Sequence, residues 1–292
     1  MAALFLTGSL CGQNLAGDQA LSKVLLDGEG WQEVAAGFGF TDGACGDAEG
    51  NFYFSDLSKG VVHKVSPDGK VAPFLEHGPK ISGLKFGPDG RLYACTQGPQ
   101  KQVIALALPS KEITVLADRV QPNDLIVSAQ GFVYFTETGR GQVTGIEIKT
   151  GRLFPAATKL NAPNGLALSP DGGTLAVSEY KGSNVWTYRV GADGALSAGA
   201  PSMTLRTPTG QAESAGDGMT VDAQGRYYVT SALGIQMFDG TGRMGGVIAR
   251  PQNKGTVSCA FAGPQLQYLY VCNSDKIFRR KTQAEGVNLF TK

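Results

Sequence analysis

Short apolar stretches separated by turn signals recur along almost the whole chain. Each unit has an apolar strand, a tight turn, a second strand rich in aromatic and β-branched residues, and two strands with weaker patterning. The first turn of the successive units falls, at spacings of 40, 41, 41, 53 and 41 residues, on Gly50, Gly90, Gly131, Gly172, Gly225 and Leu266. A period near 40 residues with four strands per unit is typical of propeller blades. The pattern therefore predicts an all-β, six-bladed β-propeller with four-stranded blades.

The unequal spacing and the chain ends refine this outline. Residues 191–216 are rich in glycine, alanine and serine, and we expect them to form a long loop inside the fourth unit. An open ring would leave exposed edge strands, so we expect residues 31–35 to supply the outer strand of the last blade. The propeller domain then spans residues 29–292, and residues 1–28 form an N-terminal appendage.

Composition narrows the class of partner. The 292 residues carry 26 lysines and arginines against 25 aspartates and glutamates, and no run of like charges indicates a nucleic-acid partner. The apolar stretch at the start lacks a basic flank and is too short for a membrane span, although it could be the remnant of an export signal. We expect a soluble monomer or small homo-oligomer with no membrane partner, in the cytoplasm or in the periplasmic or secreted space.

The five cysteines, at positions 11, 45, 95, 259 and 272, are odd in number and lack a CxxC spacing. They are predicted to be buried structural thiols rather than a disulfide framework. Cys45 and Cys259 could approach one another if the first and last blades adjoin.

A polar residue stands eight positions before every turn marker, at the start of each innermost strand. These residues are Asp42, Ser82, Asn123, Asn164, Asp217 and Ser258. Because equivalent inner-strand positions are related by the pseudo-sixfold axis, their side chains should converge on that axis. Carboxylates and carboxamides gathered there are unfavourable when buried without a partner.

A hard divalent cation would resolve this accumulation of oxygen atoms. The predicted ligands are Asp42, Asn123, Asn164 and Asp217. This set suits Ca²⁺ best, with Mg²⁺, Mn²⁺ or Zn²⁺ as alternatives, although no Cys or His in the set favours zinc. The two histidines of the chain, His63 and His77, lie in outer-strand regions of the first blade. The competing interpretation is a water-filled channel whose polar lining residues hydrogen-bond one another.

Three stretches resemble a known family of propellers. They are PNDLIV at 122–127 followed by GFVYFT at 131–136, PNGLALSPDG at 163–172, and GDGMTVD at 216–222. They resemble the senescence-marker-protein/gluconolactonase/luciferin-regenerating family and, more distantly, diisopropylfluorophosphatase. The resemblance runs from about Asp42 to Thr282 and implies a six-bladed propeller with one divalent cation on its axis.

Carried across by this resemblance, Asn164 and Asp217 match metal ligands of the family, and Asn123 matches an asparagine that touches metal or substrate. The family usually has a glutamate in an EGP motif where this chain has Asp42-Gly43-Ala44. Aspartate is one methylene shorter, so the ion must shift or a water must bridge. Two further departures are Ser258, where relatives often have asparagine, and Gln121, where many animal members have arginine.

The resemblance implies hydrolysis of small lactones or related esters. Asp217 is the expected general base and Asn123 the residue that orients the substrate or completes the coordination shell. Alternatively, Asp217 only binds the metal. Weaker candidates for substrate contact, at the ends of second strands or just beyond them, are Gln97, Glu137 and Tyr180. The sequence does not show whether they face the same mouth as the axial residues.

Two other functions stay open on the same residues: a phosphotriesterase-like hydrolase, and a non-catalytic ligand-binding propeller with a structural ion. The GxGxxG match at 240–245 is followed by a strand pattern rather than a helix, so it is predicted to be a hairpin turn. The aromatic residues of the second strands are predicted to pack between blades.

Overall fold

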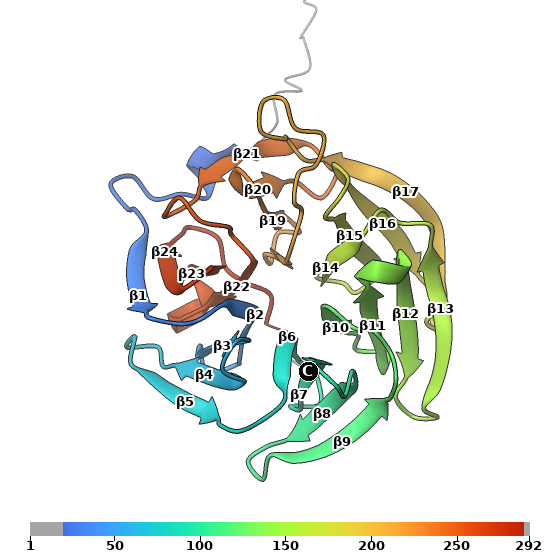
Figure 1. Cartoon of the computed structure of the whole chain (residues 1–292). Coiled ribbons are helices and arrows are strands. Elements are labelled where there is room, and N and C mark those ends of the chain that lie inside the picture. Colours follow the sequence, from blue (N-terminus) through green and yellow to red (C-terminus); the bar gives the residue numbers. More distant parts are fainter. Residues whose placement is uncertain (1–19, 289–292) are drawn as a thin grey trace, which may run out of the picture.

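The structure, a computed structural model, describes residues 20–288, and within them the strands form six separate four-stranded sheets. The sheets surround a common centre as the blades of a propeller (Figure 1). In blades 1 to 5 the four strands follow one another in chain order. The predicted all-β, six-bladed architecture is confirmed.

The strands are grouped here by blade. Blades 1 to 3 contain β2 (Thr41–Gly46), β3 (Phe52–Asp56), β4 (Val61–Val65), β5 (Val71–Leu75); β6 (Lys80–Phe86), β7 (Leu92–Gln97), β8 (Val103–Ala107), β9 (Glu112–Ala117); β10 (Leu125–Val127), β11 (Phe132–Glu137), β12 (Gln142–Glu147) and β13 (Arg152–Thr158). Blades 4 to 6 contain β14 (Pro163–Leu168), β15 (Thr174–Glu179), β16 (Asn184–Val190), β17 (Leu196–Thr204); β18 (Met219–Val221), β19 (Tyr227–Ser231), β20 (Gly234–Phe238), β21 (Met244–Ala249); β22 (Ser258–Ala262), β23 (Tyr268–Asn273), β24 (Lys276–Lys281) and β1 (Gln32–Ala36).

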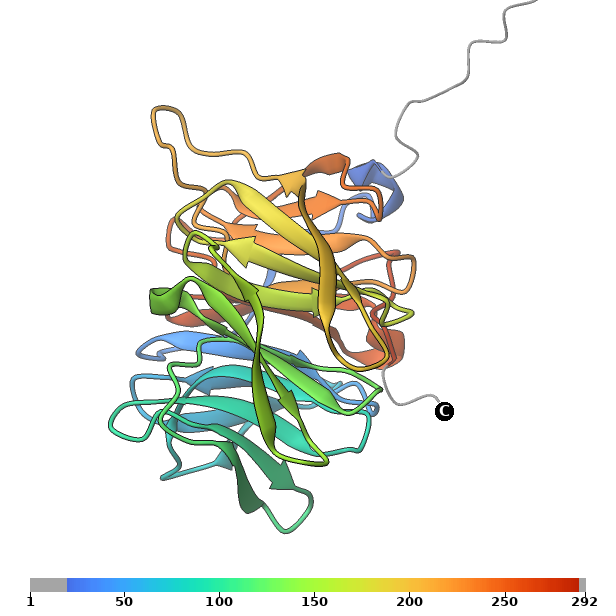
Figure 2. The same ribbon diagram turned by 90° about the vertical axis from the view of Figure 1, so that its right-hand side faces the viewer.

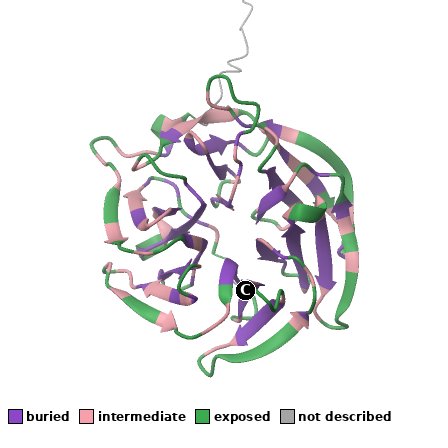
Figure 3. Cartoon of the chain, viewed as in Figure 1, coloured by how far each residue is buried: buried purple, intermediate pink, exposed green. Residues whose placement is uncertain are grey.

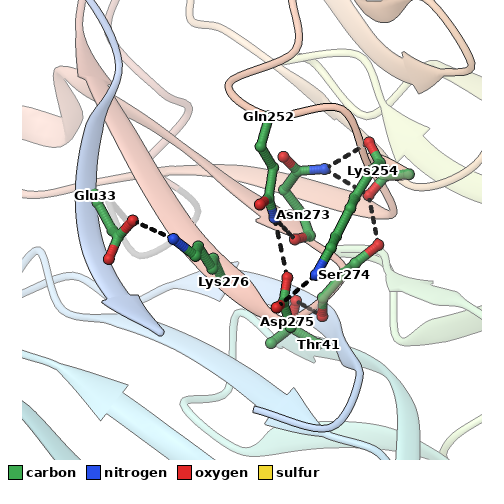
Figure 4. Close-up of polar contacts among 9 residues, drawn as sticks. Glu33, Thr41, Gln252, Lys254, Asn273, Ser274, Asp275 and Lys276 are labelled. Carbon is green, nitrogen blue, oxygen red and sulfur yellow. Dashed lines mark hydrogen bonds and ion pairs between the residues drawn. The ribbon is translucent and has the colours of Figure 1, made fainter. Parts of the chain in front are cut away.

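The last blade is closed by the start of the propeller. β1 pairs antiparallel with β24, from Gln32 opposite Arg279 to Ala36 opposite Lys276. Figure 4 shows the joint: Lys276 Nζ lies 2.7 Å from Glu33 Oε2, and Thr41 Oγ1 donates to the Ser274 carbonyl at 2.9 Å. The predicted closing strand is confirmed.

The turn between the first two strands of a blade needs a left-handed backbone. In blades 1 to 5 it is formed at the predicted glycines, with φ between 70° and 86°. In blade 6 Gln265 and Leu266 adopt φ values of 57° and 53° in the short helix η3 (Pro264–Leu266). The sixth repeat therefore keeps the turn without glycine, at a backbone conformation that other residues adopt less readily.

The cores lie between neighbouring blades, and burial falls from the inner strands to the outer ones (Figure 3). Phe52 of blade 1, for example, stacks on Tyr270 of blade 6 with ring centroids 4.4 Å apart. The second-strand aromatics predicted to pack between blades are buried, which confirms that prediction. Cys45, Cys95, Cys259 and Cys272 are free, buried thiols, so Cys45 and Cys259 are not joined.

The loop predicted at residues 191–216 is wrong in part. Residues 196–204 form the outer strand β17, which pairs with β16, and only the connection from β17 to β18 is a long loop. Most of β17 is exposed and its residues are small, so it lacks the alternation that would have indicated a strand. Figure 2 shows the long connection projecting from the face on which the short helix η2 (Thr138–Arg140) lies.

Residues 20–28 of the expected appendage pack against the propeller. The helix η1 (Leu21–Lys23) contacts β21, Val24 is fully buried, and Leu25 forms an isolated bridge with Thr282. Cys11 and the segment considered as an export signal lie outside the described residues. None of the helices in the described part of the chain has the length and apolar character that a membrane span requires.

Candidate active site

The predicted axial residues all lie where the inner strands begin. Four are inside their strands, and Asn123 and Asp217 stand two residues before β10 and β18. Each inner strand contacts the inner strands of both neighbouring blades, which closes a ring around the axis. Asp42 and Asp217 keep partial exposure, whereas Asn164 is buried.

Hydroxyl groups of one blade hold the backbone of the axial residues in the next. Ser82 Oγ donates to the Asn123 carbonyl at 2.6 Å, Thr136 Oγ1 to the Asn164 carbonyl at 2.8 Å, and Ser178 Oγ to the Asp217 carbonyl at 2.8 Å. At the closing joint, the Cys272 thiol lies 3.7 Å from the Asp42 carbonyl oxygen. These bonds fix three of the four predicted ligands relative to the preceding blade.

Glycine after an axial residue allows neighbouring inner strands to approach closely. It follows Asp42, Ser82, Asn164 and Asp217. A Cβ atom at Gly165 would lie 2.3 Å from the Asp217 carbonyl oxygen, and one at Gly83 would lie 2.8 Å from the Asp124 Cα. Blades 3 and 6 break the pattern, because Asn123 is followed by Asp124 and Ser258 by Cys259 instead of glycine.

Asp124 is a third acidic residue at the axis, and the sequence analysis missed it. It is 5% exposed; its Oδ1 accepts the Leu125 N–H at 2.8 Å, and its Oδ2 is buried without a hydrogen-bond partner. The signal that could have identified it is an acidic residue at a position where four blades have glycine.

Burial raises the proton affinity of all three carboxylates, and the charge of Asp124 adds to it at both Asp42 and Asp217. Burial, followed by the charge of Asp124, raises the pKa of Asp42 to about 8, against the N–H of Gly43 and the charge of Lys85. Burial raises the pKa of Asp217 well above its usual range, with further increases from Asp42 and Asp124. Hydrogen bonds from the Gly218 N–H and the Asn164 side chain oppose that rise. Because the inner strands of the six blades contact one another in a ring, the carboxylates of blades 1, 3 and 5 lie around the same axis.

The oxygen donors around this space are of the kind that bind a hard divalent cation. Residues 20–288 contain no group of three His, Cys, Asp or Glu side chains placed to hold an ion by themselves. A cation at this mouth would therefore need the amide oxygens of Asn123 and Asn164 beside the carboxylates of Asp42 and Asp217. The unpartnered Asp124 oxygen and the mutual repulsion of the acids are the features that a positive charge would relieve.

The ends of the second strands face the same mouth as the axial residues. Pro163 pairs with Glu179 and Asp42 with Ser55, so each antiparallel hairpin brings the end of its second strand beside the start of the first. Tyr180 is 39% exposed, and its pKa is raised by burial and by the charges of Asp217 and Glu213. It therefore lies at the rim near Asp217.

The side chains of Gln97 and Glu137 make hydrogen bonds to other groups of the protein. The Gln97 side-chain amide donates to Ser82 Oγ at 2.8 Å, which places it behind the axial ring. Glu137 is 1% exposed and accepts hydrogen bonds from the Gln121 N–H, Arg140, Gln142 and Thr144. This arrangement favours a structural role for Glu137, which anchors the loop leading to Asn123, over the predicted substrate contact.

Two other features lie away from the mouth, as expected. His63 is on β4, with its ring stacked on Phe54 at 5.1 Å. Gly240 and Gly242 lie in the connection between β20 and β21, where the Gly242 N–H donates to the Asp239 carbonyl at 3.0 Å, and Gly245 is already in β21. The hairpin prediction for the GxGxxG match is confirmed.

Comparison with known proteins places this geometry in a family. The family model described as SMP-30/Gluconolactonase/LRE-like region matches residues 33–275. The gluconolactonase of Zymomonas mobilis is 28% identical, over 87% of this chain and 81% of that protein. A solved gluconolactonase from Xanthomonas campestris is 23% identical, with a TM-score of 0.78 over 90% of this chain and 92% of that one. The calcium-binding protein regucalcin from Agrobacterium tumefaciens is 16% identical, with a TM-score of 0.70 over 88% and 95%.

The two structures support the propeller fold, and the family match covers five complete blades and most of the sixth. The motifs around Asn123, Asn164 and Asp217, on which the resemblance was based, fall inside the matched region. The chain belongs to the SMP-30/gluconolactonase/LRE-like family.

Proposed function

We propose that this chain is a metal-dependent hydrolase that opens small sugar-type lactones. The observation that carries the proposal is the meeting of Asp42, Asn123, Asn164 and Asp217, from four blades, at one mouth of the propeller. The relative named gluconolactonase, which aligns with most of the chain, supports the choice of substrate class.

Ca²⁺ is the ion that this set of oxygen donors suits best, ahead of Mg²⁺, Mn²⁺ and Zn²⁺. Asp42, Asn164 and Asp217 would hold it, with Asn123 as a further ligand. When bound, a divalent cation polarises a lactone carbonyl and stabilises the negative charge that develops on its oxygen.

Asp217 is our candidate for the general base. Its carboxylate is oriented by the Asn164 side chain, and its backbone is fixed by Ser178. Its carboxylate would lie beside the ion, where it can accept the proton that an attacking water must lose. Asn123, partly exposed at the mouth, would orient the substrate, and Tyr180 would contact it from the rim.

The test is hydrolysis of glucono-1,5-lactone and a panel of small lactones by protein stripped with a chelator and then given one metal at a time. Acid release is followed with a pH indicator, and Asp217→Asn is assayed alongside with its bound metal measured. We expect turnover that depends on the metal, is highest with Ca²⁺ and is lost in Asp217→Asn.

Two results would overturn this function in different ways. Metal binding without turnover of any lactone, together with hydrolysis of a phosphotriester, would show a phosphotriesterase-like enzyme. Metal binding without turnover of either class would favour a ligand-binding propeller with a structural ion. If Asp217→Asn keeps its metal but loses turnover, the base assignment is supported over a role in metal binding alone.

A further inference from the structure

Below the mouth, the axial channel holds a buried lysine. Lys85 is on the inner strand β6, is 8% exposed, and donates from Nζ to the Ala44 carbonyl of blade 1 at 2.9 Å. It also lines a cavity of about 90 Å³ on the axis, to which all six inner strands contribute. The ammonium group therefore lies between the polar mouth and the apolar part of the channel.

The charge of Lys85 acts on the acids of the mouth. It lowers the pKa of both Asp42 and Asp124, against the effect of burial. None of the ion pairs within 4.0 Å among the described residues involves Lys85. Its charge is therefore not paired with any single carboxylate and acts on both Asp42 and Asp124.

A count of charges gives the consequence. The side chains of Asp42, Asp124 and Asp217 contribute three formal negative charges, and Lys85, on the inner strand beside them, contributes one formal positive charge. The remainder is two negative charges, which a divalent cation neutralises. The Asp124 carboxylate is buried and takes part in no ion pair of the described residues, which is the independent sign that this group lacks a positive charge.

We propose that Lys85 is a specificity-determining residue that matches the axial site to divalent rather than trivalent cations. The inference rests on the proposed metal site. Without the ammonium group, the site would carry one more uncompensated negative charge, and a trivalent ion would gain more from that charge than a divalent ion would.

The test compares the affinities of Tb³⁺ and Ca²⁺ in wild type and in Lys85→Met, by titration calorimetry and by competition for terbium luminescence. Methionine keeps an unbranched side chain without the charge. Both ions displace the same protons from the carboxylates, so the ratio of their affinities isolates the effect of charge. We expect the preference for Tb³⁺ over Ca²⁺ to rise about tenfold, the order expected for one buried unit charge near the ion.

Lys80→Met is the matched control, because Lys80 is on the same strand but exposed, and its loss should leave the ratio unchanged. Asp124→Asn should change the ratio in the opposite direction, and adding Lys85→Met to it should restore the wild-type ratio. This second comparison carries the test if Lys85→Met alone does not fold.

The outcomes separate the two proposals. If wild type binds neither ion, the metal site itself is wrong and the role of Lys85 is overturned with it. If wild type binds both ions but neither comparison changes the ratio on loss of Lys85, only the role of Lys85 is overturned.

Discussion

The hydroxyl of Ser178 donates a hydrogen bond to the carbonyl oxygen of Asp217 at 2.8 Å, across the boundary between blades 4 and 5. Ser178 is fully buried, and its Oγ also accepts the Gly165 N–H at 2.9 Å. One side chain thus fixes both the residue after Asn164 and the backbone of the proposed base. The placement of the site therefore depends on a residue that touches no substrate.

Ser178→Ala should lower both stability and activity. The substitution leaves a buried carbonyl and a buried N–H without this partner, which costs about 1–3 kcal/mol per unsatisfied group. We expect a lower free energy of unfolding in urea and a lower kcat/KM for the best lactone. Ser178→Thr is the control, because Thr136 makes the corresponding bond to the Asn164 carbonyl in blade 3. An alanine variant as stable as wild type would contradict this role.

Glu137→Gln should lower the stability of the fold more than it lowers catalytic activity. Glutamine keeps the shape but weakens the charge-assisted hydrogen bonds from Arg140 and the Gln121 N–H. We expect a loss of about 1–3 kcal/mol in unfolding free energy, with KM for the lactone nearly unchanged. A large increase in KM at wild-type stability would instead support the substrate contact predicted from the sequence.

Metal-free protein should become less stable as the pH rises from about 5 to about 8. The pKa of Asp42 is about 8 in the folded protein, against 3.8 as its ordinary value, so over this range the folded state binds more protons than the unfolded state. The slope from one such carboxyl is at most about 1.4 kcal/mol per pH unit. The measurement is urea unfolding in a chelating buffer at several pH values.

Asp42→Asn is the control for this pH dependence and should have a smaller slope. His63 contributes with the opposite sign, because burial lowers its pKa and its stabilising effect grows as the pH rises toward 6.5. The difference between wild type and variant removes that contribution. Stability that is flat or rising from pH 5 to 8 in Asp42→Asn and wild type alike would contradict the prediction.

Chelation should lower the melting temperature, and Ca²⁺ should restore it. A ligand present at one hundred times its Kd stabilises the folded state by about 2.7 kcal/mol. Asp217→Asn should lose most of this gain, whereas Ser258→Ala, at an axial position not assigned as a ligand, should keep it. Equal calcium-dependent shifts in the two variants would place the ion elsewhere.

The six-bladed architecture could be predicted from the sequence because every blade repeats the same local pattern. Each blade needs a left-handed turn at the same place, and glycine marks five of the six. Closure by residues 31–35 followed from the need to cover an edge strand. The outer strand β17 could not be predicted in the same way, because an exposed edge of small residues has no required alternation.

The site was predictable only at its polar rim. The eight-residue offset identified the residues at the start of each inner strand, since symmetry alone brings them together. Asp124 and Lys85 lie deeper, at positions that in other blades pack against neighbours, and the repeat does not show which of these face the axis. The exception in blade 3, where aspartate replaces glycine, was the available clue.

The pairing of β1 with β24 also determines how late in synthesis the last blade can close. Glu33 and Lys276 pair although 243 residues separate them, so at ordinary translation speeds β1 leaves the ribosome about 10 to 50 seconds before its partner exists. Throughout that interval the nascent chain carries an open strand edge, which is vulnerable to pairing with other chains. A chain that ends before Lys276 lacks the strand that pairs with β1 and therefore cannot close this edge.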